Sequence, residues 1–374
     1  MHRLILPEPR YWSNLRQHNT LLFGNYQRMH NQHERDKQMN SRADMRCKIV
    51  FAAPLPPPIV ELARSMVPTG FDFIATNLQT PDFWASIEDA QFLITGFVRG
   101  GMGDKFYAAA PQLKLVQLIG SGYDGLDLDA ARKAGVLIAT NGGANSVAVA
   151  EHTLLLMLAV HRRLAWQHNN VVAGRWRVGN HAEHRLYELA GKQLGLIGFG
   201  AIGREVARRS RAFDMSVFYY ARHRLTEGDE AQLGVKYRSL EDILSSSDIV
   251  SIHVPLTPDT RGLIGPLQFA LMKDNAILIN TSRGGVVQQD ALVTALRDSK
   301  IAGAGLDVLE REPPDVNDPL LKFDTAILTP HTAGPTWENW YKSFHNSFEN
   351  VRRVAAGQVP LWIVPELDPS RTVG

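Results

Sequence analysis

The segment GFGAIG at residues 198–203 matches the pattern Gly-x-Gly-x-x-Gly and is the clearest chemical signal in the sequence. An apolar run, Leu194–Ile197, precedes it and a helical pattern follows it, which is the setting of a dinucleotide-binding turn. Gly198 permits the tight turn, Gly200 lets the backbone approach a pyrophosphate, and Gly203 lets the helix pack on the strand. A strand–helix turn without a ligand is the less favoured alternative. The cofactor-binding residues predicted here are Gly198, Gly200, Ala201, Ile202 and Gly203.

The end of the next apolar run, residues 217–220, indicates which nicotinamide cofactor is preferred. A site for NAD places an acid there, which hydrogen-bonds the ribose hydroxyls, whereas an arginine accommodates the 2′-phosphate of NADP. In this sequence Ala221 takes the place of the acid, and Arg222 and Arg224 follow it. We therefore expect both arginines to bind the cofactor, with NADPH preferred and NADH as the alternative. A solvated basic loop is the other interpretation of these two residues.

Three further segments carry Arg283, Glu312 and His331, and each follows an apolar run predicted to be a strand. In an open α/β sheet, ligands bind outside the carboxyl ends of the strands, where all three segments are expected to lie. A single arginine, glutamate or histidine at such a place is more often structural than catalytic. Three of them in the same half of the chain as the glycine motif favour a catalytic site.

Taken together, these segments resemble the D-isomer-specific 2-hydroxyacid dehydrogenase family, particularly its NADPH-using glyoxylate/hydroxypyruvate reductases. The resemblance extends over residues 48–361 and rests on residues 198–203, 253–258, 280–285, 305–313 and 330–334. It implies an enzyme that reduces a small 2-oxo acid to the D-2-hydroxy acid by hydride transfer from NAD(P)H.

The resemblance also implies a role for each member of the expected catalytic trio (Arg283, Glu312 and His331). His331 would protonate the carbonyl oxygen, and Glu312 would pair with the imidazole and keep it protonated near neutral pH. Arg283 would bind the substrate carboxylate and polarise the carbonyl. The loop Gly120–Asp124, which contains Ser121 and Gly122, would hold the same carboxylate through its backbone N–H groups. The other cofactor residues implied are Val254, Pro255, Thr281 and Asp307, the last as a partner of the nicotinamide carboxamide.

Alternating apolar runs and helical stretches predict an α/β fold with two doubly wound parallel-sheet domains. The resemblance implies that a Rossmann cofactor domain, residues 147–334, is inserted into a discontinuous flavodoxin-like substrate domain, residues 45–146 and 335–374. One long helix is expected from Val147 to about Ala173, with an apolar stripe through Leu154, Leu155 and Leu158. A final helix is expected from Thr336 to Ala356.

Residues 1–44 are polar and lack the apolar core of a secretory signal. We expect a disordered extension that is a dispensable tail, or that precedes a native start at Met39 or Met45. A stretch that resembles a metal cluster, residues 180–184, fits no standard metal-ligand spacing, so no metal site is predicted. Gly179 stands where reductases of the family often carry a second tryptophan, which would leave room for a bulkier substrate.

The composition restricts the remaining choices. The 374 residues are 44% hydrophobic and include one cysteine, so a disulfide framework is excluded. The longest apolar stretch, residues 154–160, is too short to span a bilayer, and 40 Lys and Arg against 38 Asp and Glu do not favour a nucleic-acid partner. We expect a cytoplasmic protein whose partner is a small 2-oxo or 2-hydroxy acid, and the resemblance implies a homodimer. Two alternatives stay open: a nicotinamide-binding regulator of the same fold, and a dehydrogenase of a small anion such as phosphite or formate.

Overall fold

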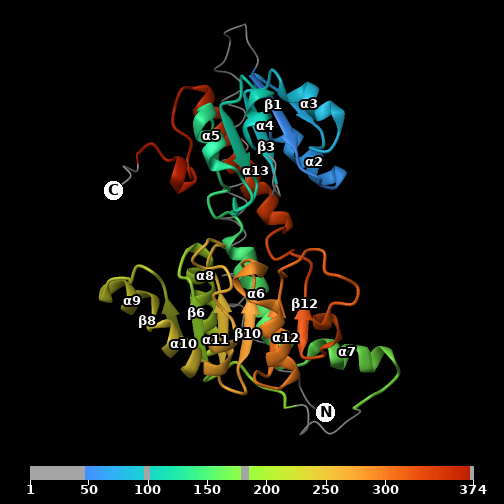
Figure 1. Cartoon of the computed structure of the whole chain (residues 1–374), viewed down its shortest axis with the longest axis vertical. Helices are drawn as coiled ribbons and strands as arrows, with labels where there is room; N and C mark the ends of the chain where they lie inside the picture. The colour runs from blue at the N-terminus through green and yellow to red at the C-terminus, as the bar shows by residue number, and fades with distance from the viewer. Residues whose placement is uncertain (1–46, 97–101, 178–184, 371–374) are drawn as a thin grey trace, which may run out of the picture.

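Two parallel β-sheets form the framework of the protein, and Figure 1 shows them one above the other. The computed structural model describes residues 47–96, 102–177 and 185–370. The expected N-terminal extension, Gly179 and the stretch 180–184 lie outside these residues. Both sheets carry helices on their two faces, so the expected fold class of two doubly wound α/β units is confirmed.

The first sheet has the strand order β2-β1-β3-β4-β5, which is the doubly wound order of flavodoxin-like folds. The inner strands β3 and β4 are short runs in which every side chain is buried, whereas the edge strand β2 is only partly buried. Val50 and Leu93 pack against α3, α4 and α5, while Ile49 and Phe51 face the opposite layer. The elements of this part are β1 (Cys47–Ala52), α2 (Pro57–Ser65), β2 (Phe71–Ala75), α3 (Pro81–Ile87), β3 (Phe92–Thr95), α4 (Asp104–Ala108), β4 (Leu115–Leu118), α5 (Leu128–Ala134) and β5 (Leu137–Ala139).

The last long helix, α13 (Trp337–Ala355), packs on this first sheet although most of the chain separates them. Phe344 and Phe348 are buried in the same cluster as the β1 side chains, and the ring of Phe344 meets that of Phe51 at 5.9 Å between centroids. The Thr336 side chain caps the helix by accepting a hydrogen bond from the Asn339 backbone N–H. This packing fits a discontinuous first domain, whose boundaries at residues 147 and 334 stay a prediction.

The second sheet has the strand order β12-β11-β10-β9-β6-β7-β8. Strand order reverses between the neighbours β6 and β9, which makes their carboxyl ends the switch point where ligands bind in such sheets. The elements are α6 (Ser146–His161), α7 (Leu164–Val172), β6 (Gln193–Ile197), α8 (Ala201–Ser210), β7 (Ser216–Tyr220), α9 (Glu227–Leu233), β8 (Val235–Tyr237), α10 (Leu240–Ser246), β9 (Ile249–Ile252), α11 (Pro266–Leu271), β10 (Ile277–Asn280), α12 (Gln289–Arg297), β11 (Gly303–Leu306) and β12 (Ala326–Leu328), with short 3-10 turns at Arg211–Phe213, Gly284–Val286, Pro319–Lys322 and, after α13, Pro365–Leu367.

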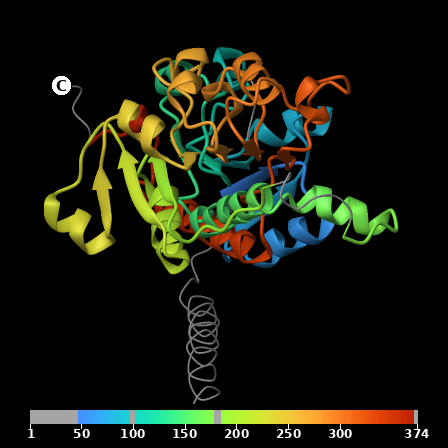
Figure 2. The ribbon, with the colours of Figure 1, turned by 90° about the horizontal axis from the view of Figure 1, so that it is seen from below.

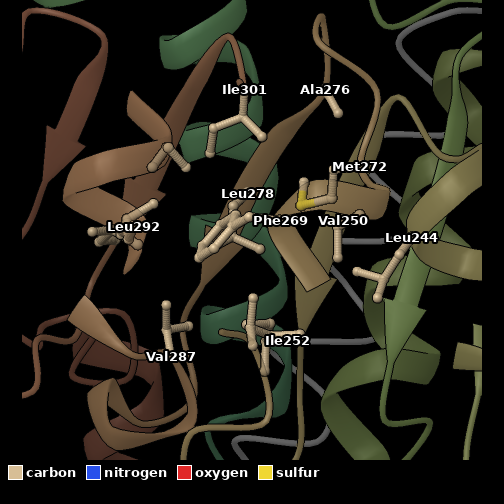
Figure 3. Close-up of a cluster of buried hydrophobic side chains, with 14 of the residues drawn as sticks. Leu244, Val250, Ile252, Phe269, Met272, Ala276, Leu278, Val287, Leu292 and Ile301 are labelled. Carbon is tan, nitrogen blue, oxygen red and sulfur yellow. The ribbon is translucent and has the colours of Figure 1, made fainter. Parts of the chain in front are cut away.

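One face of the second sheet packs against α10, α11 and α12, as the side chains in Figure 3 show. Val250 and Ile252 of β9 and Leu278 of β10 meet Phe269 and Leu292 from the helices. The opposite face is covered by α6 and α8. The inner strands β9, β10 and β11 are fully buried between these two layers, so the loops that follow them extend from a rigid, close-packed core.

The single helix expected from Val147 to Ala173 is wrong, because the chain forms two helices, α6 and α7. Arg163 interrupts them with a left-handed backbone, φ 45°. The expected apolar stripe is also wrong in part, since Leu155 is exposed while Leu154 is buried. Helix α6 lies beside α8 on one face of the second sheet, whereas α7 has no buried residue and projects from the body (Figure 2). Within the described ranges, we find no helix long and apolar enough to cross a membrane.

Candidate active site

The glycine motif forms the turn between β6 and α8, at the switch point of the second sheet. Gly198 has φ 99°, and a Cβ there would lie 2.5 Å from the His253 carbonyl oxygen. A Cβ at Gly203 would lie 2.6 Å from the Gly198 carbonyl oxygen. A Cβ at Gly200 would meet no protein atom within 4 Å, so the space above this residue is open. The turn thus fits a pyrophosphate, which would lie against Gly200 and the N-terminal N–H groups of α8.

The two arginines after β7 have different surroundings. Arg224 donates from Nε and Nη2 to the Glu230 carboxylate, at 2.9 and 3.2 Å. The Tyr219 hydroxyl donates to the same carboxylate at 3.0 Å, and these bonds hold the pKa of Glu230 below its ordinary value. Arg222 is exposed and makes no hydrogen bond or ion pair with the residues that the structure describes. Arg224 therefore stabilises the loop through Nε and Nη2, although its side chain is 53% exposed, and the binding of the cofactor by Arg222 and Arg224 stays a prediction.

His331 and Glu312 meet at the carboxyl end of the second sheet. The imidazole Nδ1 lies 2.9 Å from Glu312 Oε2, and Glu312 Oε1 accepts a hydrogen bond from the Leu309 backbone N–H at 3.1 Å. The His331 side chain is 41% exposed, which leaves the imidazole accessible to a ligand. Because Nδ1 faces the carboxylate, Nε2 is the nitrogen that can exchange a proton with a substrate.

The loop that carries His331 is held by Asp307 at the end of β11. The Asp307 carboxylate is 1% exposed and accepts hydrogen bonds from the Thr329 hydroxyl at 2.6 Å and from the Thr332 and Ala333 N–H groups at 2.8 and 2.9 Å. The Asp307 carbonyl also accepts the His331 N–H at 2.8 Å. Asp307 thereby supports the left-handed backbone of His331, φ 55°. Its contact with the nicotinamide carboxamide stays a prediction.

Arg283 follows β10 and reaches across to the first sheet. Its Nη1 donates to the Ser282 carbonyl at 2.8 Å, and its Nε donates to Asp124 at 2.9 Å. A Cβ at Gly122 would overlap the guanidinium. The structure therefore brings Arg283 against the loop that was expected to bind the same carboxylate, Gly120–Asp124.

The remaining expected residues lie around these groups. Ser121 Oγ is 2.9 Å from the side-chain oxygens of Asn141 and Asn145, at the crossing between the two sheets. Thr281 is buried, and its hydroxyl lies 3.0 Å from that of Thr153 on α6. Ala201 and Ile202 form the first turn of α8. Val254 and Pro255 follow β9, with the Val254 side chain against Gly198.

Comparisons with known proteins show the family of the chain. The sequence pattern of the D-isomer specific 2-hydroxyacid dehydrogenase, NAD binding domain, matches residues 154–333. A glyoxylate reductase from Aeropyrum pernix is 44% identical over 255 residues, which is 67% of this chain and 76% of the relative. The chain belongs to the D-isomer-specific 2-hydroxyacid dehydrogenase family.

Solved structures of this family superimpose on most of the chain. A glyoxylate reductase from Paecilomyes thermophila has a TM-score of 0.75 at 30% identity and covers 86% of this chain and 99% of its own. An NADPH-dependent glyoxylate/hydroxypyruvate reductase from Sinorhizobium meliloti, in complex with NADP and malonate, has a TM-score of 0.73 at 28% identity and covers 88% and 100%. The fold and the reduction of 2-oxo acids with NAD(P)H are therefore properties of this dehydrogenase.

Sequence reasoning on this dehydrogenase missed three polar residues that support the site. Asp124 pairs with Arg283, Glu230 pairs with Arg224, and His152 on α6 lies 2.9 Å from the Thr329 hydroxyl. No motif marks Glu230 or His152 as partners, and Asp124 lies 159 residues from Arg283 in the sequence. A short polar segment, Gly120–Asp124, was the one available signal for Asp124. Among the described residues, no group of three His, Cys, Asp or Glu side chains could hold a metal ion.

His253, the other histidine beside the glycine motif, is a structural residue. Burial lowers its pKa to about 3, so the imidazole is neutral throughout the physiological range. Its Nε2 lies 2.9 Å from the Ser251 hydroxyl, and its backbone closes the turn over Gly198. An imidazole kept neutral by burial cannot supply a proton to a substrate, and the role of His331 as the acid stays a prediction.

Proposed function

We propose that this dehydrogenase reduces a small 2-oxo acid of the glyoxylate or hydroxypyruvate type to the D-2-hydroxy acid, with NADPH as the preferred cofactor. The observation that supports this most is the His331–Glu312 pair at the switch-point edge of the sheet that carries the open glycine turn. An ionised pair of this kind can hold a proton for delivery to a carbonyl oxygen.

Each member of the trio has a defined task in this proposal. Arg283 binds the substrate carboxylate with its fork of N–H donors and draws electron density from the adjacent carbonyl. The bound cofactor supplies the hydride that adds to C2 of the substrate. His331 gives the proton on Nε2 to the carbonyl oxygen, so the product is the 2-hydroxy acid and the imidazole is left neutral. Glu312 holds Nδ1 and thereby keeps Nε2 directed away from the loop.

The cofactor preference rests on Ala221 and Arg222. No acid stands at the end of β7 for the ribose hydroxyls, and Arg222 is an exposed cation beside that position. The 2′-phosphate would lie against Arg222, because Arg224 is already engaged by Glu230.

A panel of 2-oxo acids tests the proposal directly. NADPH oxidation, followed by absorbance with glyoxylate, hydroxypyruvate, pyruvate and bulkier 2-oxo acids, is compared with NADH oxidation. We expect turnover that is faster with NADPH and highest with the smallest substrates. Turnover limited to bulky substrates would overturn the substrate class, and equal or faster turnover with NADH would overturn the cofactor preference. Tight cofactor binding without turnover of any 2-oxo acid would favour a regulator or a small-anion dehydrogenase.

We also infer a homodimer, and helix α7 supports it. This helix has no buried residue, and its exposed apolar side chains continue into the segment that follows it. They are Leu164, Val171, Val172 and Trp176. A second copy that covered them would remove a large apolar area from water. Light scattering should give twice the mass of one chain, and the mass of one chain would contradict the inference.

A further inference from the structure

Asp124 and Arg283 form an ion pair between the two sheets. Arg283 follows β10 of the second sheet, and Asp124 follows β4 of the first. The guanidinium Nε donates to Asp124 Oδ1 at 2.9 Å, and the side chains are 22% and 19% exposed. A half-buried, charge-assisted bond of this kind is stronger than an exposed surface pair.

The guanidinium is held on more than one side. The Ser282 carbonyl accepts a hydrogen bond from Nη1 at 2.8 Å, while the Gly122 backbone lies so close that a Cβ there would overlap Nη2. Ser282 fixes Arg283 to its own sheet, and Asp124 fixes it to the other one. Without Asp124, the long arginine side chain would lose the partner that orients its Nε edge.

We propose that Asp124 is a positioning residue, which sets the orientation of the Arg283 guanidinium for the substrate carboxylate and ties that orientation to the approach of the two sheets. The inference rests on the proposed function, in which Arg283 binds that carboxylate. Asp124 accepts the hydrogen bond of Arg283 Nε, whereas Ser282 accepts that of Nη1. The two bonds therefore hold the guanidinium at two different nitrogens. An aspartate that instead competed with the substrate for Arg283 would weaken substrate binding. Removing Asp124 would then lower the KM for the oxo acid, whereas loss of a positioning residue would raise it.

Steady-state kinetics of Asp124→Ala and Asp124→Asn with glyoxylate and NADPH tests this role. A misplaced binding group costs on the order of 100-fold in kcat/KM for the oxo acid, and we expect that loss for Asp124→Ala, with a higher KM for glyoxylate and an unchanged KM for NADPH. Asp124→Asn keeps an oxygen acceptor for Nε, so it should recover activity to within about 10-fold of the native enzyme. Unchanged kcat/KM, or a lower KM for glyoxylate in Asp124→Ala, would overturn the proposal.

A double-variant cycle tests whether Asp124 acts through Arg283. Arg283→Lys keeps a cation but lacks Nε, so adding Asp124→Ala in that background should cost less than about 3-fold. A loss as large as in the native background would overturn the proposal. Asp248→Ala is the matched control, because Asp248 pairs with Lys273 at 2.9 Å and is 17% exposed at the amino end of β9. The kcat/KM of Asp248→Ala per folded molecule should equal that of the native enzyme. A 100-fold loss in this control would show that breaking any partly buried ion pair lowers activity, and would overturn the specific role of Asp124.

A crystal structure of Asp124→Ala separates this inference from the proposed function. If the native enzyme turns over no 2-oxo acid, the proposed function fails. The positioning role can still be tested, because the crystal structure shows where the Arg283 guanidinium lies without Asp124. We expect the guanidinium to leave the Gly122 surface by more than about 1 Å, the scale on which misplacement affects catalysis. A guanidinium in its original place would overturn the positioning role whatever the substrate is.

Discussion

Nδ1 of His331 lies 2.9 Å from Oε2 of Glu312, although 19 residues separate them in the sequence. The approach is possible because Asp307 ties the His331 loop to the end of β11, and Glu312 lies on the segment that continues from the same strand. Asp307 therefore fixes the His331 loop, while the Leu309 N–H holds the Glu312 carboxylate. The proposed proton transfer depends on the contact between His331 Nδ1 and Glu312 Oε2.

Glu312→Gln should lower kcat about 10- to 100-fold with 2-oxo acids. Glutamine still offers an oxygen to Nδ1, but it lacks the negative charge that stabilises a protonated imidazole. Steady-state NADPH oxidation measures the loss. Glu310→Gln is the control, because Glu310 lies two residues away on the same loop, is exposed and bonds the Gln289 N–H. An equal loss in both variants would point to damage of the loop and would contradict the role of Glu312.

Gly200→Ala and Gly203→Ala should fail in different ways. A Cβ at Gly200 meets no protein atom, so this variant should fold normally while its dissociation constant for NADPH rises by roughly 10-fold or more, since the methyl group occupies the pyrophosphate space. A Cβ at Gly203 meets the Gly198 carbonyl at 2.6 Å, so that variant should lose about 1–3 kcal/mol of unfolding free energy. Cofactor titration and denaturant unfolding measure the two effects. Normal NADPH affinity in Gly200→Ala would contradict the cofactor site.

Arg222→Ala should raise the KM for NADPH by about 10- to 100-fold, the cost of one lost charge-assisted contact, and leave the KM for NADH unchanged. Arg224→Ala is the comparison, because Arg224 is bound to Glu230 and Tyr219 donates to the same carboxylate. That variant should lose stability and change the NADPH-to-NADH preference less than Arg222→Ala does. The reverse order of the two effects would assign the 2′-phosphate to Arg224.

The stability of the protein should fall in acid partly through His161. Burial, and then the charge of Lys192, lower the pKa of His161 from 6.5 to about 4, so the native state holds the neutral imidazole. The unfolded chain binds the proton first as pH falls below 6.5, so the contribution of His161 is complete above that pH and is lost progressively toward pH 4. This shift corresponds to about 3 kcal/mol of unfolding free energy.

Chemical unfolding of His161→Phe at pH 7 and pH 4.5 measures this contribution. The variant cannot titrate, so its unfolding free energy should fall less between the two pH values than that of the native protein. His168→Gln changes an exposed histidine of α7 and should behave like the native protein. An identical fall in His161→Phe and the native protein would contradict the buried neutral histidine.

Much of the fold could be predicted because its strands are apolar runs with clear spacing. The run Leu194–Ile197 and the glycines after it lie where the pattern predicts, since a buried parallel strand and a tight turn each demand particular residues. The break between α6 and α7 at Arg163 was missed because no Gly or Pro lies there. Arginine rarely adopts the left-handed backbone that Arg163 has, so its residue type does not predict a break.

The site was predictable to the extent that strand order brings strand ends together. Arg283 and His331 follow strands of one sheet, so their placement at one edge follows from topology. The pairing of Arg283 with Asp124 depends on how two loops from different sheets meet, which no local pattern encodes. In the same way, the sequence around Arg224 does not reveal that Glu230 binds it.

The most direct measurement combines the transfer of the hydride to the substrate with the effect of removing His331. The native enzyme and His331→Ala are incubated with glyoxylate and NADPH that carries deuterium at the transferable C4 position, and glycolate is analysed by mass spectrometry. The native enzyme should form glycolate with one deuterium on C2, while His331→Ala should be slower by about 100- to 10,000-fold and still bind NADPH. Unlabelled glycolate, no glycolate from the native enzyme, or near-native turnover by His331→Ala would contradict the account.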